Sequence, residues 1–167
     1  MAKSTQLIFE ILDAEKERLF QYASYRLRNI RDVEDALQNI YVRTLSDPGR
    51  FGRIENKKAY LYRMLCNECT NLLREDTKTA SVDIDSFAAL ELESLQPENF
   101  EEEFVMINRL LGMLPAEQSE TIRLKLHSNL SFQEIADVME VPLPTAKARY
   151  RYGIEKIRNG LKKENLL

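Results

Sequence analysis

The stretch that decides the fold is SFQEIADVMEVPLPTAKARYRYGIEKIR, residues 131–158. Ser131 and Glu134 have the spacing of a capping box, in which the serine caps a helix and the glutamate reaches back to the cap. Leu130 and Ile135 flank this start, so a hydrophobic staple is available as well. The pattern predicts a helix of about nine residues after Ser131. The residues expected on its buried face are Phe132, Ile135, Ala136 and Met139.

A short turn at residues 140–143 leads to a second helix. Pro144 falls in its first turn, where the missing N–H costs little. Between residues 145 and 163 the sequence has seven Lys or Arg and one acid, Glu155, whereas an ordinary solvated helix face would mix the two signs. This arrangement favours a helix-turn-helix whose second helix enters the major groove of DNA. Its candidate DNA contacts are Thr145, Lys147, Ala148, Arg149, Arg151 and Tyr152.

The net charge of −3 averages unlike parts of the chain. The parts are residues 1–80 with a net charge of +2, residues 81–104 with −8, and residues 105–167 with +3. We therefore expect two domains, residues 1–78 and 104–167, joined by an acidic linker over residues 79–103. The linker is expected to be a solvated spacer, and its charge would also repel nucleic acid.

The composition predicts an all-α chain. Hydrophobic residues make up 44% and charged residues 31% of the sequence, which is ordinary for a globular protein. Charged residues recur at helical spacing, and no long alternating pattern of a β-strand occurs. The first residues lack the apolar core of an ordinary signal peptide, and no apolar run approaches the roughly 20 residues of a membrane span. We therefore expect a cytoplasmic protein.

The segment RDVEDALQNIYVRTLSDPG, residues 31–49, predicts one complete helix in the first domain. Its apolar positions form a single stripe that faces the core. The stripe consists of Val33, Ala36, Leu37, Ile40, Tyr41, Thr44 and Leu45. Asp32 is expected to cap the start of this helix, and Asp47-Pro48-Gly49 to end it. An earlier helix is expected over about residues 5–28.

A further helix, expected from about Asn56 to Glu75, has two unlike faces. The apolar face carries Leu61, Tyr62, Leu65, Cys69, Leu72 and Leu73. The opposite face carries Tyr60, Arg63, Asn67, Thr70, Asn71 and Arg74. Aromatic rings, amides and guanidinium groups stack on bases, bond to base edges and neutralise phosphates. This face is therefore a candidate nucleic-acid surface, with an exposed helix that merely lacks acids as the alternative.

Three segments together resemble the bacterial RNA polymerase sigma factors of the extracytoplasmic-function type. DVEDALQNIY (32–41) is similar to the family's acidic helix that docks on core polymerase, and AYLYRMLCNECTNLLRE (59–75) to the helix that melts and reads the minus-10 element. LPAEQSETIRLKL together with the stretch quoted first is similar to the family's minus-35 reader. Helix-turn-helix patterns alone are common, so the resemblance depends on all three segments in this order. It covers nearly the whole chain.

The resemblance implies a role for individual residues. The residues expected to bind core polymerase are Asp32, Asp35 and Gln38. Those expected at the minus-10 element are Phe51, Tyr60, Arg63, Asn67 and Arg74, with Phe51 in a loop that captures a flipped base. The implied partners are core RNA polymerase, promoter DNA and an anti-sigma factor. No cofactor is implied.

The sequence departs from the family at several positions. Tyr60 stands where the family usually has Trp, and Glu140 stands where a glycine is frequent. Ala146 and Ala148 replace a common Val and Ser. Ala148 cannot donate a hydrogen bond from its side chain, so contact with a thymine methyl group is its only route to base specificity. These departures bear on which promoter is read.

Two other classes of protein stay open at this point. A stand-alone helix-turn-helix regulator would explain residues 105–167 but not the face of Tyr60, Arg63 and Asn67. A helical protein-interaction module is the third possibility. An enzyme has little support, because His127 is the only histidine and we find no nucleophile–base pair and no phosphate-binding glycine loop. His127 is expected simply to end a helix.

Cys66 and Cys69 form a CxxC pair. A single pair without another cysteine or a nearby histidine is weak support for a zinc site. Cys69 belongs to the apolar face of its helix and Cys66 borders it, so we expect buried structural thiols, with a redox switch as the alternative. The sequence therefore predicts no metal site.

Overall fold

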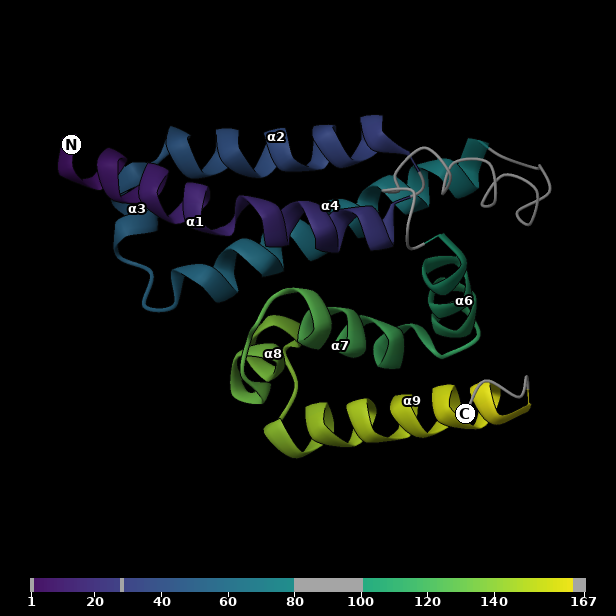
Figure 1. Cartoon of the computed structure of the whole chain (residues 1–167). Coiled ribbons are helices and arrows are strands. Elements are labelled where there is room, and N and C mark those ends of the chain that lie inside the picture. Colours follow the sequence, from purple (N-terminus) through teal and green to yellow (C-terminus); the bar gives the residue numbers. More distant parts are fainter. Residues whose placement is uncertain (1, 28, 80–100, 164–167) are drawn as a thin grey trace. The chain divides into compact units, whose positions relative to one another are not determined.

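The computed structural model of the chain describes residues 2–27, 29–79 and 101–163 (Figure 1). All regular secondary structure in these three ranges is helical, which confirms the predicted all-α fold. The chain divides into two compact units, Met1–Leu95 and Gln96–Leu167. The predicted acidic linker lies mostly outside the described ranges.

The first unit consists of three long helices and one short one. These are α1 (Ala2–Arg26), α2 (Ile30–Ser46), α3 (Pro48–Gly52) and α4 (Lys57–Thr79). Helix α1 packs against the other three, and α2 packs against α4 (Figure 1). The largest fully buried side chains of this unit are Ile8, Leu19, Tyr22, Ile40, Leu61, Tyr62 and Leu65. They come from α1, α2 and α4, so the three long helices share one core.

The start of α2 differs from the prediction. Asn29, not Asp32, is the N-cap: its backbone is extended, and its side-chain Oδ1 accepts the backbone N–H of Asp32 at 2.8 Å. Asp32 instead lies in the first turn and accepts a hydrogen bond from the Asn29 side chain at 3.0 Å. Both residue types cap helices well, so spacing along the sequence could not choose between them.

The predicted end of α2 is confirmed, because the helix stops at Ser46. Asp47 then caps a new helix, since its Oδ1 accepts the backbone N–H of Arg50 at 3.0 Å. Pro48 occupies the first position of α3, where its lack of an N–H does no harm. The prediction of a loop at Phe51 is therefore wrong, because the same Asp-Pro-Gly signal that ends α2 also starts α3.

The second unit also contains four described helices. They are α6 (Glu101–Gly112), α7 (Ala116–His127), α8 (Phe132–Met139) and α9 (Leu143–Lys163). The capping box is confirmed: the Ser131 hydroxyl accepts the Glu134 N–H at 3.1 Å, and the Glu134 carboxylate accepts the Ser131 N–H at 3.0 Å. Helix α6 begins at Glu101, slightly before the expected end of the linker.

The buried face of α8 differs from the predicted stripe. Ile135 and Ala136 are fully buried as expected, but Val138 is also buried, whereas Phe132 and Met139 are only half-buried. Helix α8 packs against both α7 and α9. Because two helices pack against α8, its buried face is not a single stripe. The prediction that Met139 rather than Val138 is buried is therefore wrong.

Candidate nucleic-acid interface

The first half of α4 separates its two faces as predicted, whereas Leu72 and Leu73, also predicted on the apolar face, are only half-buried. Leu61, Tyr62 and Leu65 are fully buried, while Arg63 and Asn67 are exposed. Of the other four residues predicted on the outer face, Tyr60 and Thr70 are half-buried, and Asn71 and Arg74 are exposed. Asn56 caps the helix by accepting the backbone N–H of Ala59 at 2.9 Å. The polar face of α4 is therefore exposed to solvent, and the Asn56 cap defines where the helix begins.

A hollow of about 700 Å³ lies beside this face. Its walls come from the end of α2, from α3 and the turn after it, and from the first half of α4. The residues of most chemical interest around it are Arg43, Arg50, Phe51, Tyr60, Arg63 and Asn67. The volume falls in the range of typical ligand pockets. The structure thus brings together four of the five predicted minus-10 residues.

Arg74 does not line this hollow. It lies seven residues beyond Asn67 on α4, which corresponds to about 10 Å along the helix axis. A strand that occupies the hollow would need to continue along α4 to reach it. Arg74 therefore stays a prediction that the geometry of the hollow does not support.

Phe51 cannot present its ring to a base in this conformation, because the residue is only 2% exposed. Its ring instead lies 6.2 Å from the ring of Tyr60, centroid to centroid, at an interplanar angle of 57°. The predicted flipped-base contact at Phe51 is therefore not supported by its position. The Phe51 ring is buried in the core, and its contact with the Tyr60 ring can fix the orientation of the half-buried tyrosine.

Arg43 and Arg50 are two residues of this hollow that the sequence analysis missed. Arg43 is exposed in the last turn of α2, and Arg50 is exposed in α3. Neither belongs to a segment with a basic run, so only their proximity to Tyr60 and Arg63 identifies them. In the sequence each is an isolated arginine, and an isolated arginine is too common a feature to single out a site.

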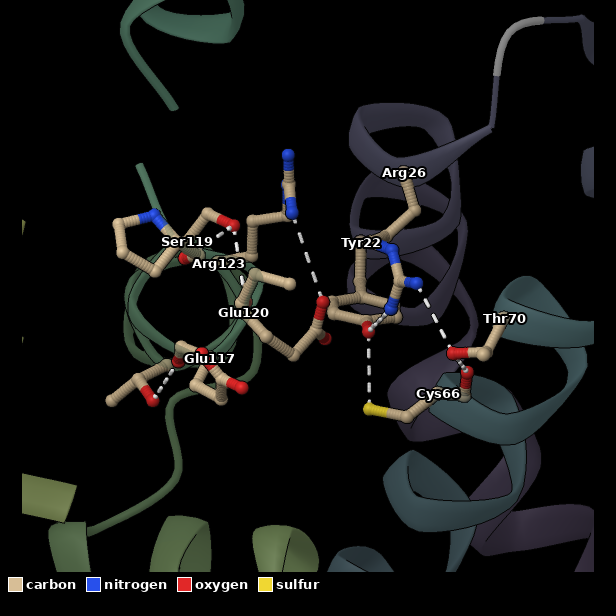
Figure 2. Close-up of polar contacts among 11 residues, drawn as sticks. Tyr22, Arg26, Cys66, Thr70, Glu117, Ser119, Glu120 and Arg123 are labelled. Atoms are coloured by element: carbon tan, nitrogen blue, oxygen red, sulfur yellow. Dashed lines mark hydrogen bonds and ion pairs between the residues drawn. The ribbon is translucent and has the colours of Figure 1, made fainter. Parts of the chain in front are cut away.

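A hydrogen-bonded network ties α1 to the middle of α4 (Figure 2). The Arg26 guanidinium donates to the Tyr22 hydroxyl at 3.1 Å and to the Thr70 hydroxyl at 3.2 Å. The Tyr22 hydroxyl lies 3.0 Å from the Cys66 sulfur. Thr70, which the helical spacing placed on the candidate DNA face, is thus held by the fold. The network fixes how α4 is rotated against α1.

Neither cysteine forms a disulfide bond in the part of the chain that the structure describes. Cys69 is buried, as expected, whereas Cys66 is half-buried and contacts Tyr22. Within the described residues, no group of three or more His, Cys, Asp or Glu side chains is arranged to hold a metal ion.

A buried tyrosine of α4, Tyr62, connects this helix to α1. The Tyr62 hydroxyl donates to the Glu15 carboxylate at 3.2 Å, and Lys58 lies 3.7 Å from the same carboxylate. Burial is the main cause that raises the pKa of Tyr62, and the negative charge of Glu15 raises it further. Tyr62 therefore stays a neutral hydrogen-bond donor, which joins α1 to α4 through Glu15.

In the second unit, α9 presents the predicted basic face. Lys147, Arg151 and Tyr152 are exposed. The other three candidates, Thr145, Ala148 and Arg149, are half-buried. None of the basic candidates Lys147, Arg149 and Arg151 forms an ion pair in the described part of the chain. The Arg151 guanidinium lies 5.2 Å from the centroid of the Tyr152 ring, and because both residues are exposed, its charge stays at the surface.

The aromatic residues behind this face attach α9 to α8. The rings of Phe132 and Tyr150 meet edge to face with centroids 5.2 Å apart. Lys125 of α7 places its Nζ 4.5 Å from the centroid of Phe132 and donates to the carbonyl of Leu130 at 3.3 Å. These contacts join α7, α8 and α9, so the basic face rests on a rigid support.

The candidate polymerase-binding residues lie on α2. Asp35 and Gln38 are exposed and, being three residues apart, lie on one face of the helix. Asp32 is half-buried and is held by Asn29. Asp35 and Gln38 are thus available to a partner, whereas Asp32 also serves the start of its own helix.

His127 is the last residue of α7, as predicted. Burial, together with the positive charge of Arg123, lowers the pKa of His127 to about 4. Arg123 itself lies 3.7 Å from the Glu120 carboxylate (Figure 2).

No described helix is long and apolar enough to cross a membrane.

Two family models match the chain. Residues 11–79 match Sigma-70 region 2, and residues 104–157 match Sigma-70, region 4. The ECF RNA polymerase sigma factor SigW of Bacillus subtilis is 23% identical over 92% of this chain and 88% of its own length. The ECF RNA polymerase sigma-E factor of Escherichia coli strain K12 is 28% identical over 77% of this chain and 73% of its own length.

Two solved structures share the fold. CnrH in complex with the cytosolic domain of CnrY has a TM-score of 0.74 and 18% identity, and the match covers 97% of this chain and 94% of that one. The sigma factor RpoE in complex with the anti-sigma factor NepR, from Bartonella quintana, has a TM-score of 0.69 and 22% identity, over 97% and 98% of the two chains.

The order of the two matched regions agrees with the geometry of the two units. The region 2 match ends with α4 and its polar face, and the region 4 match includes the helix-turn-helix of α8 and α9. The family consists of transcription initiation factors, and the curated relatives are ECF sigma factors. The chain therefore belongs to the sigma-70 family of bacterial RNA polymerase sigma factors, within its extracytoplasmic-function group.

Proposed function

We propose that the chain binds core RNA polymerase and directs it to promoters by reading a minus-35 element and opening a minus-10 element. One observation carries the proposal. Each unit presents a helix with an outward face rich in cationic and hydrogen-bonding groups, α4 in the first unit and α9 in the second. In this proposal, residues 1–78 and 104–167 are the two promoter-binding domains and residues 79–103 connect them.

The minus-35 element is read by α9 in the major groove. Its N-terminal half supplies Lys147, Arg149 and Arg151 for phosphates and guanine edges, because arginine and lysine bind these groups well. Ala148 contributes apolar contact to a thymine methyl group. Thr145 and Tyr152 lie on the same outward part of the helix and complete the predicted contact set.

The minus-10 element is opened by α4 and the hollow beside it. Tyr60, Arg63 and Asn67 engage bases of the separated non-template strand. Stacking on the Tyr60 ring and hydrogen bonds from Asn67 offset the cost of extruding a base, which is a few kcal/mol. The protein catalyses no covalent step itself, and binding energy drives strand opening.

Core polymerase docks on the exposed face of α2. Asp35 and Gln38 supply the contacts, and Asp32 extends them at the start of the helix. A partner of polymerase works in the cytoplasm, which agrees with the expected location. The CnrH and RpoE structures are complexes with CnrY and with the anti-sigma factor NepR, respectively. By analogy, we expect an anti-sigma factor to hold this chain inactive.

Run-off transcription tests the proposal. The full chain, mixed with core polymerase and the promoter region upstream of its own gene, is expected to yield a specific transcript that neither component yields alone. A helix-turn-helix regulator would bind the template without co-purifying with core polymerase. Failure of the chain to associate with core polymerase, combined with templates that stay closed, would overturn the proposal.

A further inference from the structure

Arg43 stands at a junction of two hollows. It lines the 700 Å³ hollow together with Tyr60 and Arg63, and it also lines a second hollow of about 420 Å³ with Glu68 and Asn71. Its side chain is 60% exposed, although it forms an ion pair. A guanidinium has five N–H donors, so the donors not directed at its partner remain available to a ligand.

The partner of Arg43 is a buried carboxylate. A Glu68 oxygen lies 3.0 Å from an Arg43 nitrogen, and the Glu68 side chain is only 8% exposed. The other Glu68 oxygen accepts a hydrogen bond from the Asn39 side chain at 3.1 Å. Glu68 belongs to α4, whereas Asn39 and Arg43 belong to α2. A carboxylate bonded on both oxygens has little freedom, so it holds the guanidinium in one place.

Two more guanidinium groups line the same hollow from other elements. Arg50 comes from α3 and makes no ion pair with a described residue, and Arg63 comes from α4. Among the residues that the structure describes, the only acid that lines the hollow is Asp47, whose carboxylate is engaged as the cap of α3. With Glu68 counted as the partner of Arg43, three cations face two engaged carboxylates, and this excess of positive charge favours an anionic ligand. Arg43 and Arg50 lie on the α2 and α3 side of the hollow, and Tyr60 and Asn67 lie on the α4 side.

We infer that Arg43 and Arg50 bind phosphate groups of the separated strand while Tyr60 and Asn67 engage its base, and that Glu68 positions Arg43 for this contact. The inference rests on the proposed function and deepens it, because it assigns the strand's backbone to α2 and α3. A guanidinium fixed by a carboxylate binds phosphate with less loss of side-chain freedom. Glu68 touches no DNA and acts only through Arg43.

The salt dependence of strand binding tests the two arginines. Holoenzyme assembled from the full chain and core polymerase binds a labelled non-template oligonucleotide from a promoter that the wild type transcribes. Arg43→Ala and Arg50→Ala are each expected to weaken binding about tenfold, as for one charge-assisted hydrogen bond. Each should also reduce the slope of log K against log salt concentration by about 0.7, the value for one phosphate on a single strand.

Two control variants separate charge from fold. Arg43→Lys keeps the charge and should keep the salt slope. Arg53→Ala removes an exposed arginine just after α3 that does not line the hollow, and it should bind like the wild type. The inference about the arginines is wrong if Arg43→Ala and Arg50→Ala retain both the affinity and the slope of the wild type.

Glu68→Gln tests the positioning role, because glutamine keeps the size but loses the charge. It should weaken strand binding in the wild-type background and have no further effect in the Arg43→Ala background. An equal loss in both backgrounds would show that Glu68 acts through the general fold. A scan with one neutral methylphosphonate at a time adds a second readout: at the phosphate that Arg43 contacts, Arg43→Ala should lose its effect.

The two levels of the proposal fail in different ways. If wild-type holoenzyme transcribes but the arginine variants bind the strand normally, the phosphate assignment alone is wrong. If the wild type does not join core polymerase at all, the proposed function is wrong.

Discussion

Glu140 ends α8 in a conformation that a side chain disfavours. Its backbone has φ 57° and ψ 46°, the left-handed region, and its N–H bonds to the carbonyls of Ala136 and Asp137. A Cβ atom in this region costs about 1 kcal/mol, which glycine avoids. The glycine that the family frequently has here thus has a physical reason. This chain bears the strain instead.

Glu140→Gly should raise the free energy of unfolding of the second unit by about 0.5–1 kcal/mol. The matched control is Asp137→Gly, an exposed position inside α8, which should lower it by about 1 kcal/mol. Chemical denaturation followed by circular dichroism measures both. A Glu140→Gly variant less stable than the wild type would show that Glu140 makes contacts worth more than its backbone strain.

His127 should remain neutral well below the pH at which histidines normally protonate. Its pKa is lowered to about 4 in the folded state, against about 6.5 in an unfolded chain. The unfolded state therefore binds the proton first, so folding stability falls as the pH decreases from about 6.5 to about 4. Because His127 is the only histidine, one imidazole signal in an NMR titration reports the midpoint. A midpoint near 6.5 in the native protein would contradict the burial.

The close approach of α7 and α9 depends on a glycine. A Cβ added at Gly153 would lie 2.5 Å from the Cδ1 atom of Ile122, and Ile122 is fully buried. Helix propensity alone would favour alanine at position 153 by about 1 kcal/mol. Overpacking of a core costs about 1–3 kcal/mol, so packing outweighs propensity at this crossing.

Gly153→Ala is therefore expected to destabilise the second unit by about 1 kcal/mol, the difference between those two effects. Ile122→Val removes the clashing methyl group. The double variant should therefore lose less stability than the sum of the two single changes, which thermal unfolding of all four proteins can show. Additive losses would mean that the two side chains do not meet.

The helices also differ in how well periodicity and capping signals predict them. The helix after Ser131 and the end of α2 at Asp47 follow from local rules, and the structure confirms them. The predicted buried face of α4 is confirmed at Leu61, Tyr62, Leu65 and Cys69, whereas Leu72 and Leu73 are only half-buried. The cap of α2 was misassigned, because Asn29 and Asp32 satisfy the same local rule. Val138 was missed for a different reason. The number of helices that pack around α8 does not follow from the sequence of α8 itself.

For the molecule as a whole, changes to the two proposed DNA-binding surfaces should cause separate defects. Arg149→Ala removes a cation of α9 and should weaken minus-35 binding by about 1–3 kcal/mol if the guanidinium contacts a base. The control is Arg158→Ala, an exposed cation further along the same helix. Promoter affinity measured over several salt concentrations tests the change. An affinity equal to that of the wild type throughout would remove Arg149 from the contact set.

Asn67→Ala should give the complementary defect. The side chain is exposed beside the hollow, so its loss should impair strand opening while binding to core polymerase stays intact. Permanganate footprinting measures opening, and co-purification with polymerase measures binding. Asp35→Ala is the reciprocal control, because it should weaken polymerase binding. Normal melting by Asn67→Ala would remove the residue from the minus-10 site.

The sequence by itself determined α1, α2, α4, α8 and α9, most residues of their apolar faces and the basic outer face of α9, because periodicity and capping are local properties. It did not determine α3. It also determined the family, since three segments in one order carry that resemblance. Only the tertiary structure decided which residues surround the hollow. Arg43, Arg50 and Tyr60 come from three helices, and Phe51 leaves the candidate surface because it packs into the core. Proximity between distant segments depends on how helices pack, and no local pattern specifies it.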